Sequence, residues 1–440
     1  MRRLVRSGAP VLRSTAAVAT SMTALVATSL VTGPALAGSL VAPCELTRSE
    51  AHHSEGVDTW NAGYTRPTHP LDAVLVFLSF PDAAPTTTPA ELTADYFPAT
   101  SRYFERASYG RFTVHPHPVT HWIRMPHPST AYAIQRDWNT ERRSAYLRDA
   151  LAAADNDVDF SRYDIVYFVA DPNAPGVDSD ATKVVNLDTP LRADGKDIRR
   201  VVTVFEKHPP DRLVLAHETG HVFDLPDLYH RPVDGKGDWD TYVGDWDLMG
   251  SQFGLAPDLF AWHKWKLGWL DDSQVLCVRG TARLTLESLG GGPTGVPQVP
   301  VNASTGSGTG AAGTAGPQVL GPGVQAFGSG RGTKLAVVRT GPDSALAIEA
   351  RGAVGNDAAV CSQGVLVYRV RSETESGGGP IEVVDAHPHT SACPDNSVYP
   401  ALADAPVSVG ESFTVPGTGV RVEVEDRTPT GAWTVRITRV

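Results

Sequence analysis

Three runs of apolar residues, each long enough for a strand but too short for a core helix, most restrict the folds open to this chain. They cover residues 73–80, 165–170 and 200–205. Because the runs are nearly continuous instead of alternating, they predict strands that are buried on both faces. Residues 93–107 and 144–154 lie between them and have helical spacing. Strands that alternate with helices predict an α/β layer around a partly parallel sheet.

The pattern changes near residue 270, after which short strands replace the helices. We expect strands at residues 282–287, 334–339, 346–349, 365–370, 420–424 and 433–440. Residues 289–333 are rich in Gly, Ala, Thr, Ser and Pro and nearly uncharged, which predicts a flexible insertion. A chain of 440 residues is long enough for two domains. The sequence therefore predicts an α/β (α+β) domain over residues 71–270 and a β-sandwich-like domain over residues 271–440.

The first 37 residues have the layout of a secretory signal peptide. Arginines at positions 2, 3, 6 and 13 precede an apolar run that ends in Ala35-Leu36-Ala37. A positive end, an apolar stretch and small residues at the cleavage site are typical of such peptides. An N-terminal membrane anchor is the alternative, but no other segment is long and apolar enough to span a bilayer. We expect a secreted, extracellular protein without stable membrane association, in which residues 38–70 form a leader or an N-terminal wrapping segment.

Four cysteines remain after the signal peptide: Cys44, Cys277, Cys361 and Cys393. An even number in an exported chain predicts two disulfides, with three possible pairings. Cys361 with Cys393 is the favoured pair because both lie in the β-rich region, which leaves Cys44 with Cys277. In an alternative hypothesis, an unpaired Cys44 caps a metal ion in a latent form.

Residues 213–227 carry the strongest chemical signal of the chain. His217 and His221 are four residues apart, so on a helix both imidazoles project from one face and can bind one metal ion. The carboxylate of Glu218 is poorly placed to bind that ion directly, but it can reach a water molecule that is bound to the ion. Zinc would polarise a carbonyl and acidify the water, while the carboxylate takes the proton and passes it to the leaving amine. This division of roles suits peptide hydrolysis.

Three features distinguish this pattern from a solvated helix that carries two histidines and an acid by chance. Residues 213–216 are apolar, which predicts that the helix is buried in a core. Residues 224–227 then end the helix, where a turn could return a further ligand to the metal. Residues 244–250, which include Met249, follow shortly after.

Together these motifs resemble the metzincin clan of zinc peptidases, and more specifically the immune inhibitor A-type (M6) family of metalloproteases. Metzincins carry the long motif H-E-x-x-H-x-x-G-x-x-H/D and a methionine turn beneath the metal. Further stretches that resemble this family are residues 74–82, 103–112, 159–168, 217–229 and 261–270. The resemblance covers residues 71–270, with a weaker one at 364–370. It implies a zincin-like catalytic domain with a mixed sheet, an active-site helix and one catalytic Zn²⁺ ion.

The resemblance also implies a role for each matching residue. The metal-ligand positions are held by His217, His221 and Asp227. Glu218 stands at the position of the general base, and Met249 at the methionine turn. Three protein ligands and a water would leave the open position that a catalytic zinc needs.

One position departs from the family pattern, because Asp224 replaces the glycine of the long motif. That glycine lets the chain turn with a positive φ, a conformation that Asp tolerates better than most residues. We therefore expect the turn to form. Otherwise Asp227 would be misplaced, and Asp245 or Asp247 would be the alternative third ligand.

Weaker candidates surround the motif. Tyr229 and Tyr242 could donate a hydrogen bond to an oxyanion, although packing is the simpler interpretation of each. Residues 234–240 form an acidic loop, so Ca²⁺ is a second candidate ion, but the loop lacks EF-hand spacing. The tryptophans at positions 262, 265 and 269 predict the core of a helix packed near the site. Without metal-ligand spacing, the remaining histidines predict surface or packing roles, among them His115, His117, His121, His127 and His263.

The function that fits these features is cleavage of protein or peptide substrates by a zinc endopeptidase. The net charge of −11 argues against nucleic acid as a partner, because phosphate binding needs a basic face. A monomer is the simplest expectation for the oligomeric state, which the sequence does not determine. Two alternatives stay open: a non-catalytic secreted binding or adhesion protein on a degenerate peptidase scaffold, and a zinc amidase that acts on cell-wall material.

Overall fold

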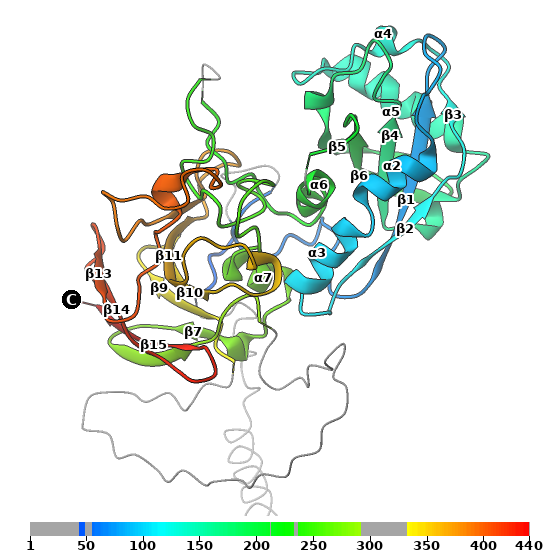
Figure 1. Cartoon of the computed structure of the whole chain (residues 1–440). Helices are drawn as coiled ribbons and strands as arrows, with labels where there is room; N and C mark the ends of the chain where they lie inside the picture. Colours follow the sequence, from blue (N-terminus) through cyan, green and yellow to red (C-terminus); the bar gives the residue numbers. More distant parts are fainter. Residues whose placement is uncertain (1–43, 49–54, 212, 233–235, 292–331, 440) are drawn as a thin grey trace, which may run out of the picture. The chain divides into compact units, whose positions relative to one another are not determined.

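A mixed sheet forms the N-terminal half of the computed structural model, which describes residues 44–48, 55–211, 213–232, 236–291 and 332–439 (Figure 1). The six strands of this sheet are β1 (Leu71–Ser79), β2 (Val114–Pro118), β3 (Ile123–Arg124), β4 (Ile165–Ala170), β5 (Lys183–Ala193) and β6 (Lys196–Val204). Their order is β2-β1-β4-β6-β5, with β3 also paired to β1. All pairs are parallel except β5 with β6, so an antiparallel strand closes one edge.

Helices pack on both faces of this sheet. The helices of the described chain are α2 (Pro89–Tyr96), α3 (Ala99–Ala107), α4 (Ser129–Tyr132), α5 (Thr140–Ala154), α6 (Val214–Val222) and α7 (Ala261–Leu267). On one face, alternate residues of β4 such as Val166 and Phe168 share a core with Leu147 of α5. On the other face, the hydroxyl groups of Tyr167 and Thr219 of α6 lie 2.8 Å apart. Successive side chains of a strand point to opposite faces, which explains why the central strands β1 and β4 are apolar on nearly every residue.

The single helix predicted over residues 93–107 is wrong, because two helices occupy this stretch. Helix α2 ends at Tyr96, and α3 begins at Ala99. Pro98 separates them: it has no N–H to donate, and it disfavours the helical conformation in the residue before it. Phe97 is accordingly extended, with φ of −119° and ψ of 139°.

Strand β5 was not expected from the sequence. Its segment contains Asp188 and Pro190, two residue types that are depleted in strands. The pairing with β6 also shifts register between Asn186 and Leu191. Such interruptions are tolerated at a sheet edge, where half of the backbone groups have no partner strand.

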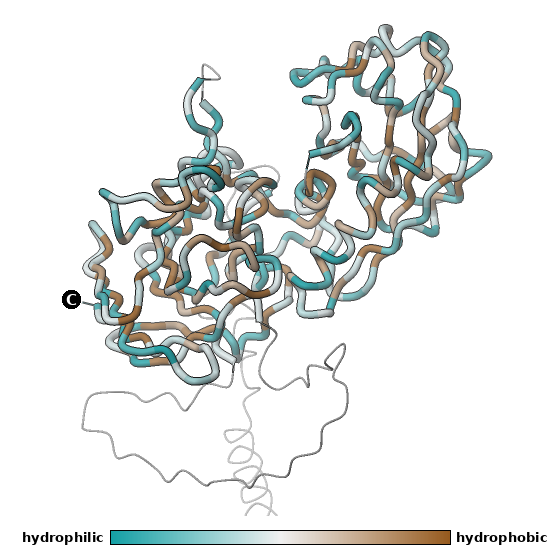
Figure 2. The backbone as a smooth tube through the Cα atoms, viewed as in Figure 1, coloured by the Kyte–Doolittle hydropathy of each residue, from teal (hydrophilic) through white to brown (hydrophobic). Residues whose placement is uncertain are grey.

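The C-terminal half consists of two sheets that share one hydrophobic core. The five-stranded sheet contains β7 (Val275–Cys277), β9 (Leu335–Arg339), β10 (Ser344–Arg351), β11 (Gly364–Arg371) and β12 (Ile381–Val383). The four-stranded sheet contains β8 (Ala282–Leu286), β13 (Ser412–Val415), β14 (Val420–Arg427) and β15 (Trp433–Arg439). Ile348 and Val367 of the first sheet belong to the same cluster as Val422 and Val435 of the second. Figure 2 shows hydrophobic residues, in brown, along several strands, and hydrophilic residues, in teal, in many loops.

Six of the C-terminal strands lie where the sequence predicts them. The signal peptide and most of the insertion predicted over 289–333 lie outside the described residues. The domain boundary near residue 270 stays a prediction. Together the three sheets and the flanking helices make the described chain a mixed α+β protein.

Two disulfides connect the cysteines in the favoured pairing, Cys44 with Cys277 and Cys361 with Cys393. The hypothesis of an unpaired Cys44 over the metal is therefore wrong. Disulfides persist in oxidising compartments, which agrees with an extracellular or similarly oxidising environment. None of the helices in the described ranges has the length and apolar composition that a membrane span needs.

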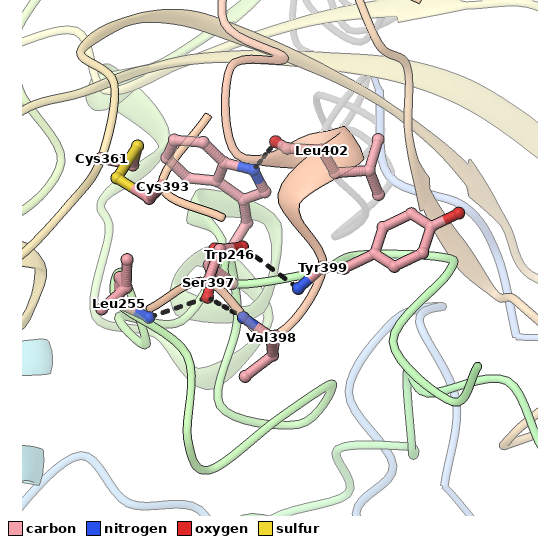
Figure 3. Close-up of a disulfide and its surroundings, with 9 residues drawn as sticks. Trp246, Leu255, Cys361, Cys393, Ser397, Val398, Tyr399 and Leu402 are labelled. Atoms are coloured by element: carbon pink, nitrogen blue, oxygen red, sulfur yellow. Dashed lines mark hydrogen bonds between the residues drawn. A yellow bond between two sulfur atoms is a disulfide. The ribbon is translucent and has the colours of Figure 1, made fainter. Parts of the chain in front are cut away.

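The loop around the second disulfide packs against residues that follow α6 in the sequence (Figure 3). The indole N–H of Trp246 donates to the carbonyl oxygen of Leu402 over 2.8 Å. The carboxylate of Asp245 accepts from the backbone N–H of Leu255 and of Val398, at 3.0 and 3.2 Å. The C-terminal half thereby supports the loop that carries Met249.

A buried arginine makes a second connection between the two halves. Arg351 on β10 is fully buried, and its guanidinium is 2.8 Å from a carboxylate oxygen of Glu349 and 3.2 Å from one of Asp357. It also donates to the backbone carbonyl groups of Trp246 and Ala256, at 2.9 and 2.8 Å. Buried charges of this kind are tolerated only when they are fully paired.

Replacing Arg351 by leucine should leave two carboxylates buried without their cation. We expect Arg351→Leu to lower the free energy of unfolding by about 3–5 kcal/mol. Denaturant unfolding of the full chain measures this loss. Arg421→Leu, at an exposed position on β14, is the matched control and should change stability little. Equal effects of the two substitutions would contradict the role given to Arg351.

Candidate metal centre

Helix α6 presents two imidazoles from a buried position. All nine residues of this helix are buried, as the apolar sequence before His217 predicts. The rings of His217 and His221 lie on the same side of the helix, with their centroids 5.0 Å apart. Each Nδ1 lies within hydrogen-bond distance of a backbone oxygen, that of Leu248 for His217 (2.9 Å) and that of Leu225 for His221 (2.7 Å). These contacts favour the tautomer in which Nδ1 carries the proton, so that each Nε2 keeps a free lone pair.

The turn after the helix brings Asp227 back to the two histidines. Asp224, which replaces the family glycine, has a φ of 65°, so the prediction that it adopts the left-handed conformation is confirmed. Its carboxylate is 2.8 Å from Nζ of Lys266 on α7 and accepts from the N–H of Asn61 over 3.3 Å. These contacts stabilise a conformation that costs a non-glycine residue energy.

The side chains of His217, His221 and Asp227 converge in the structure. Oδ1 of Asp227 lies 3.3 Å from Nε2 of His217 and 3.1 Å from Nε2 of His221. All three atoms lie within 4.8 Å of one another, and among the described residues they form the single group of His, Cys, Asp and Glu that could hold a metal ion, the candidate metal-binding group. Atoms held about 2.0–2.1 Å from one ion in a tetrahedral arrangement would be about 3.3–3.4 Å apart. The observed spacing therefore fits a zinc site.

Oδ1 of Asp227 gives a second test of this fit. The atom is buried, yet among the described residues it has no well-aligned hydrogen-bond donor. A buried carboxylate oxygen without such a donor is costly in a folded protein, and coordination of a cation would remove the cost. Two imidazole nitrogens and one carboxylate oxygen are also ligands that zinc binds well.

The charges of the three groups are strongly coupled. Burial disfavours protonation of His221, but the nearby charge of Asp227 outweighs it and raises the pKa of His221 to about 10. Burial by itself would raise the pKa of the Asp227 carboxyl. The charges and hydrogen bonds of His221 and His217 outweigh burial and hold this pKa well below the usual range. In the absence of a metal, the site therefore favours a proton on His221, where a cation would otherwise be bound.

Glu218 lies beside these three groups but has its own environment. Burial raises the pKa of its carboxyl, and Oε2 accepts a hydrogen bond from the N–H of Val184 on β5 over 2.7 Å. One oxygen is thus oriented by the edge strand of the sheet. The carboxylate lines the same cleft as the two histidines and Asp227.

The loop that carries Met249 lies directly against α6. A Cβ atom on Gly220 would be 2.5 Å from Sδ of Met249, so only glycine admits this close packing without a shift. The N–H of Met249 donates to Asp247 over 2.8 Å, and its carbonyl accepts from the N–H of Leu228 over 2.9 Å. Asp247 also accepts from the N–H of Phe260. Asp247, like Asp245, therefore orients the loop and does not belong to the candidate metal-binding group.

The two candidate tyrosines occupy different environments. Tyr229 lines the cleft, and its ring stacks on that of His217 with a centroid distance of 6.4 Å. Burial and the charge of Asp227 raise the pKa of Tyr229, so it keeps its proton at neutral pH. The hydroxyl of Tyr242 is instead 3.1 Å from Nδ1 of His230, and its ring packs against Gly379. Only Tyr229 thus lies beside the candidate ligands.

The other aromatic and histidine predictions concern packing. The tryptophans at positions 262, 265 and 269 are buried on and just after α7, which contacts the turn at Asp224 through Lys266. His263 is fully buried, with Nδ1 3.1 Å from Asp247, whereas the other four histidines named above are well exposed. The acidic loop considered for Ca²⁺ lies partly outside the described residues.

The metal centre opens into a cleft of about 610 Å³. Several lining residues were not expected from the sequence, among them Glu55, Arg143, Lys183, Asn186 and Arg231. Glu55, from the segment before the sheet, accepts a hydrogen bond from the side-chain amide of Asn186 on β5. No motif marks these positions, because they come from separate elements that only the fold brings together.

No protein-family model and no curated protein matches the chain. The resemblance to the metzincins therefore rests on the sequence motifs alone.

Asp227→Ala should lower the zinc content of the purified protein, because it removes one of three converging ligands. Metal analysis after dialysis against a zinc buffer measures the occupancy. Asp180→Asn is the matched control, since the exposed Asp180 lines the same cleft but does not converge with the two histidines. Full zinc occupancy in the Asp227→Ala protein would remove Asp227 from the ligand set.

Zinc affinity should increase as the pH rises. The metal-free site keeps a proton on His221 up to a pH of about 10, and zinc must displace that proton to bind. Below this pKa, the Kd for zinc should fall about tenfold for each unit by which the pH rises, for each proton that zinc displaces. Competition with a chelator of known affinity, from about pH 7 to about pH 9, measures the slope. A Kd that does not change with pH would contradict the coupling between His221 and Asp227.

Proposed function

We propose that the chain is a secreted zinc-dependent endopeptidase of the metzincin type. The observation that carries the proposal is the spacing of 3.1 and 3.3 Å between Asp227 Oδ1 and the two imidazole Nε2 atoms. Glu218 stands beside this group in the same cleft. The oxidising environment indicated by two disulfides agrees with secretion.

Zinc held by His217, His221 and Asp227 would supply a Lewis acid that polarises a peptide carbonyl and makes a water molecule more acidic. Glu218 has the complementary task. Its raised pKa, caused by burial, makes the carboxylate a better proton acceptor than an exposed glutamate. It takes a proton from the attacking water and returns it to the amine nitrogen that leaves.

The neighbours of Glu218 hold it in position for this task. The N–H of Val184 binds Oε2 and leaves Oε1 for the proton. Tyr229, protonated at neutral pH, is the nearby donor that could stabilise negative charge on the carbonyl oxygen. The depth of α6 in the core limits movement of the helix that carries Glu218.

The test compares Glu218→Gln with the unmodified chain on casein, each with and without a chelator. We expect the substitution to lower kcat by about 10²–10⁴-fold, because glutamine cannot accept the proton. The zinc content should stay unchanged, since Glu218 is not among the converging ligands. A chelator should abolish the activity of the unmodified protein.

Two results would contradict the proposal. Undiminished casein cleavage by the Glu218→Gln protein would exclude Glu218 as the base. A zinc-loaded protein that cleaves no peptide bond in casein or gelatin would favour a binding protein or an amidase. Release of amino groups from cell-wall material would then indicate the amidase, and no release would indicate the binding protein.

A further inference from the structure

Four cations line the cleft beside the metal centre, although the whole chain has a net charge of −11. Arg143 comes from α5, Lys183 from β5, and Arg136 and Arg231 from loops. Their gathering at one cleft of an acidic protein is not expected from composition. Five carboxylates line the same cleft, so any attraction for anions is confined to the part that the four cations form.

These cations have few anionic partners in the described structure. Among the described residues, the partly buried guanidinium of Arg143 has no hydrogen-bond or ion-pair partner. Lys183 donates to the backbone carbonyl of Arg136, whose guanidinium lies 4.7 Å from the ring centroid of Trp239. Arg231 is 3.5 Å from Asp137, and both side chains are largely exposed, so this pair is weak.

Most acidic groups of the same lining are already engaged. Glu218 accepts from Val184, Asp227 faces the two imidazoles, and Glu55 accepts from Asn186. The remaining lining carboxylates are those of Asp137, described above, and of Asp180, which is exposed. Burial and the charge of Arg143 lower the pKa of Lys183, in agreement with two cations that repel each other across the cleft.

A second chamber, of about 510 Å³, shares His217, Glu218 and Arg136 with the first, but Arg143, Lys183 and Arg231 do not line it. Its lining carboxylates include Glu206, Asp211 and Asp240. An acidic side chain would be repelled there and attracted toward Arg143 and Lys183. The two chambers therefore give the cleft an electrostatic polarity.

We propose that the cleft selects peptides with an acidic side chain on one side of the bond to be cleaved, bound by Arg143 and Lys183. The proposal rests on the peptidase function proposed above. A carboxylate suits this site because arginine can bind it through two parallel hydrogen bonds, while lysine adds a second charge. The acidic second chamber restricts the carboxylate to one side.

Quenched-fluorescent peptides that carry Glu, Gln or Lys at matched positions on either side of the cleaved bond test the selection. For the zinc-loaded full chain, we expect kcat/KM to be about tenfold higher with Glu than with Gln at one of these positions, mainly through KM. Arg143→Gln should bring this ratio close to one. Arg142→Gln, at the exposed neighbouring position of α5 outside the cleft, is the matched control and should keep the ratio.

Binding provides a readout that does not depend on catalysis. Fluorescence anisotropy with the Glu218→Gln chain should show tighter binding of the Glu peptide than of the Gln peptide, and weaker discrimination at higher salt. Equal binding and cleavage of both peptides would overturn the inference, as would an unchanged ratio in the Arg143→Gln, Lys183→Gln double variant. If no peptide is cleaved, the proposed function fails, while the binding comparison still decides whether the cleft prefers acidic ligands.

Discussion

The contact of one carboxylate with two imidazoles is the interaction on which the rest of the candidate site depends. Asp227 reaches His217 and His221 only because the chain reverses at Asp224 directly after α6. That reversal uses a left-handed residue other than glycine, which is strained unless its surroundings hold it. Here Lys266 supplies the charge that holds the Asp224 carboxylate. The metal centre therefore depends on a second, buried ion pair behind it.

Support for the site extends into the C-terminal half. The carbonyl of Leu248 orients His217, and Met249 packs on α6 at Gly220. The loop that carries both residues is held by contacts of Trp246 with Leu402 and with Arg351. A β-rich module can thus contribute to chemistry without supplying a reacting group, because it fixes backbone atoms that orient the ligands.

The electrostatics of the cleft separate two tasks. The candidate metal-binding group is an anion beside two imidazoles, which favours a bound cation. Arg143 and Lys183, a short distance along the cleft, favour an anion instead. In the proposed peptidase, the first preference would concern the catalyst and the second the substrate, so changes at α5 or β5 would alter selectivity while the metal centre stays intact.

Local features of the sequence determined the helix with His217 and His221, the left-handed turn at Asp224, the apolar strands and the β-rich second half, because each depends on neighbours along the chain. Pro98 marks a helix break that its residue type already implies. Edge strand β5 and the cations at the cleft could not be predicted, since an edge strand lacks a regular apolar pattern and Arg143 lies far from α6 in the sequence. Only the tertiary structure decided which backbone N–H orients Glu218, because hydrogen bonds between distant segments depend on how the sheet and helix pack.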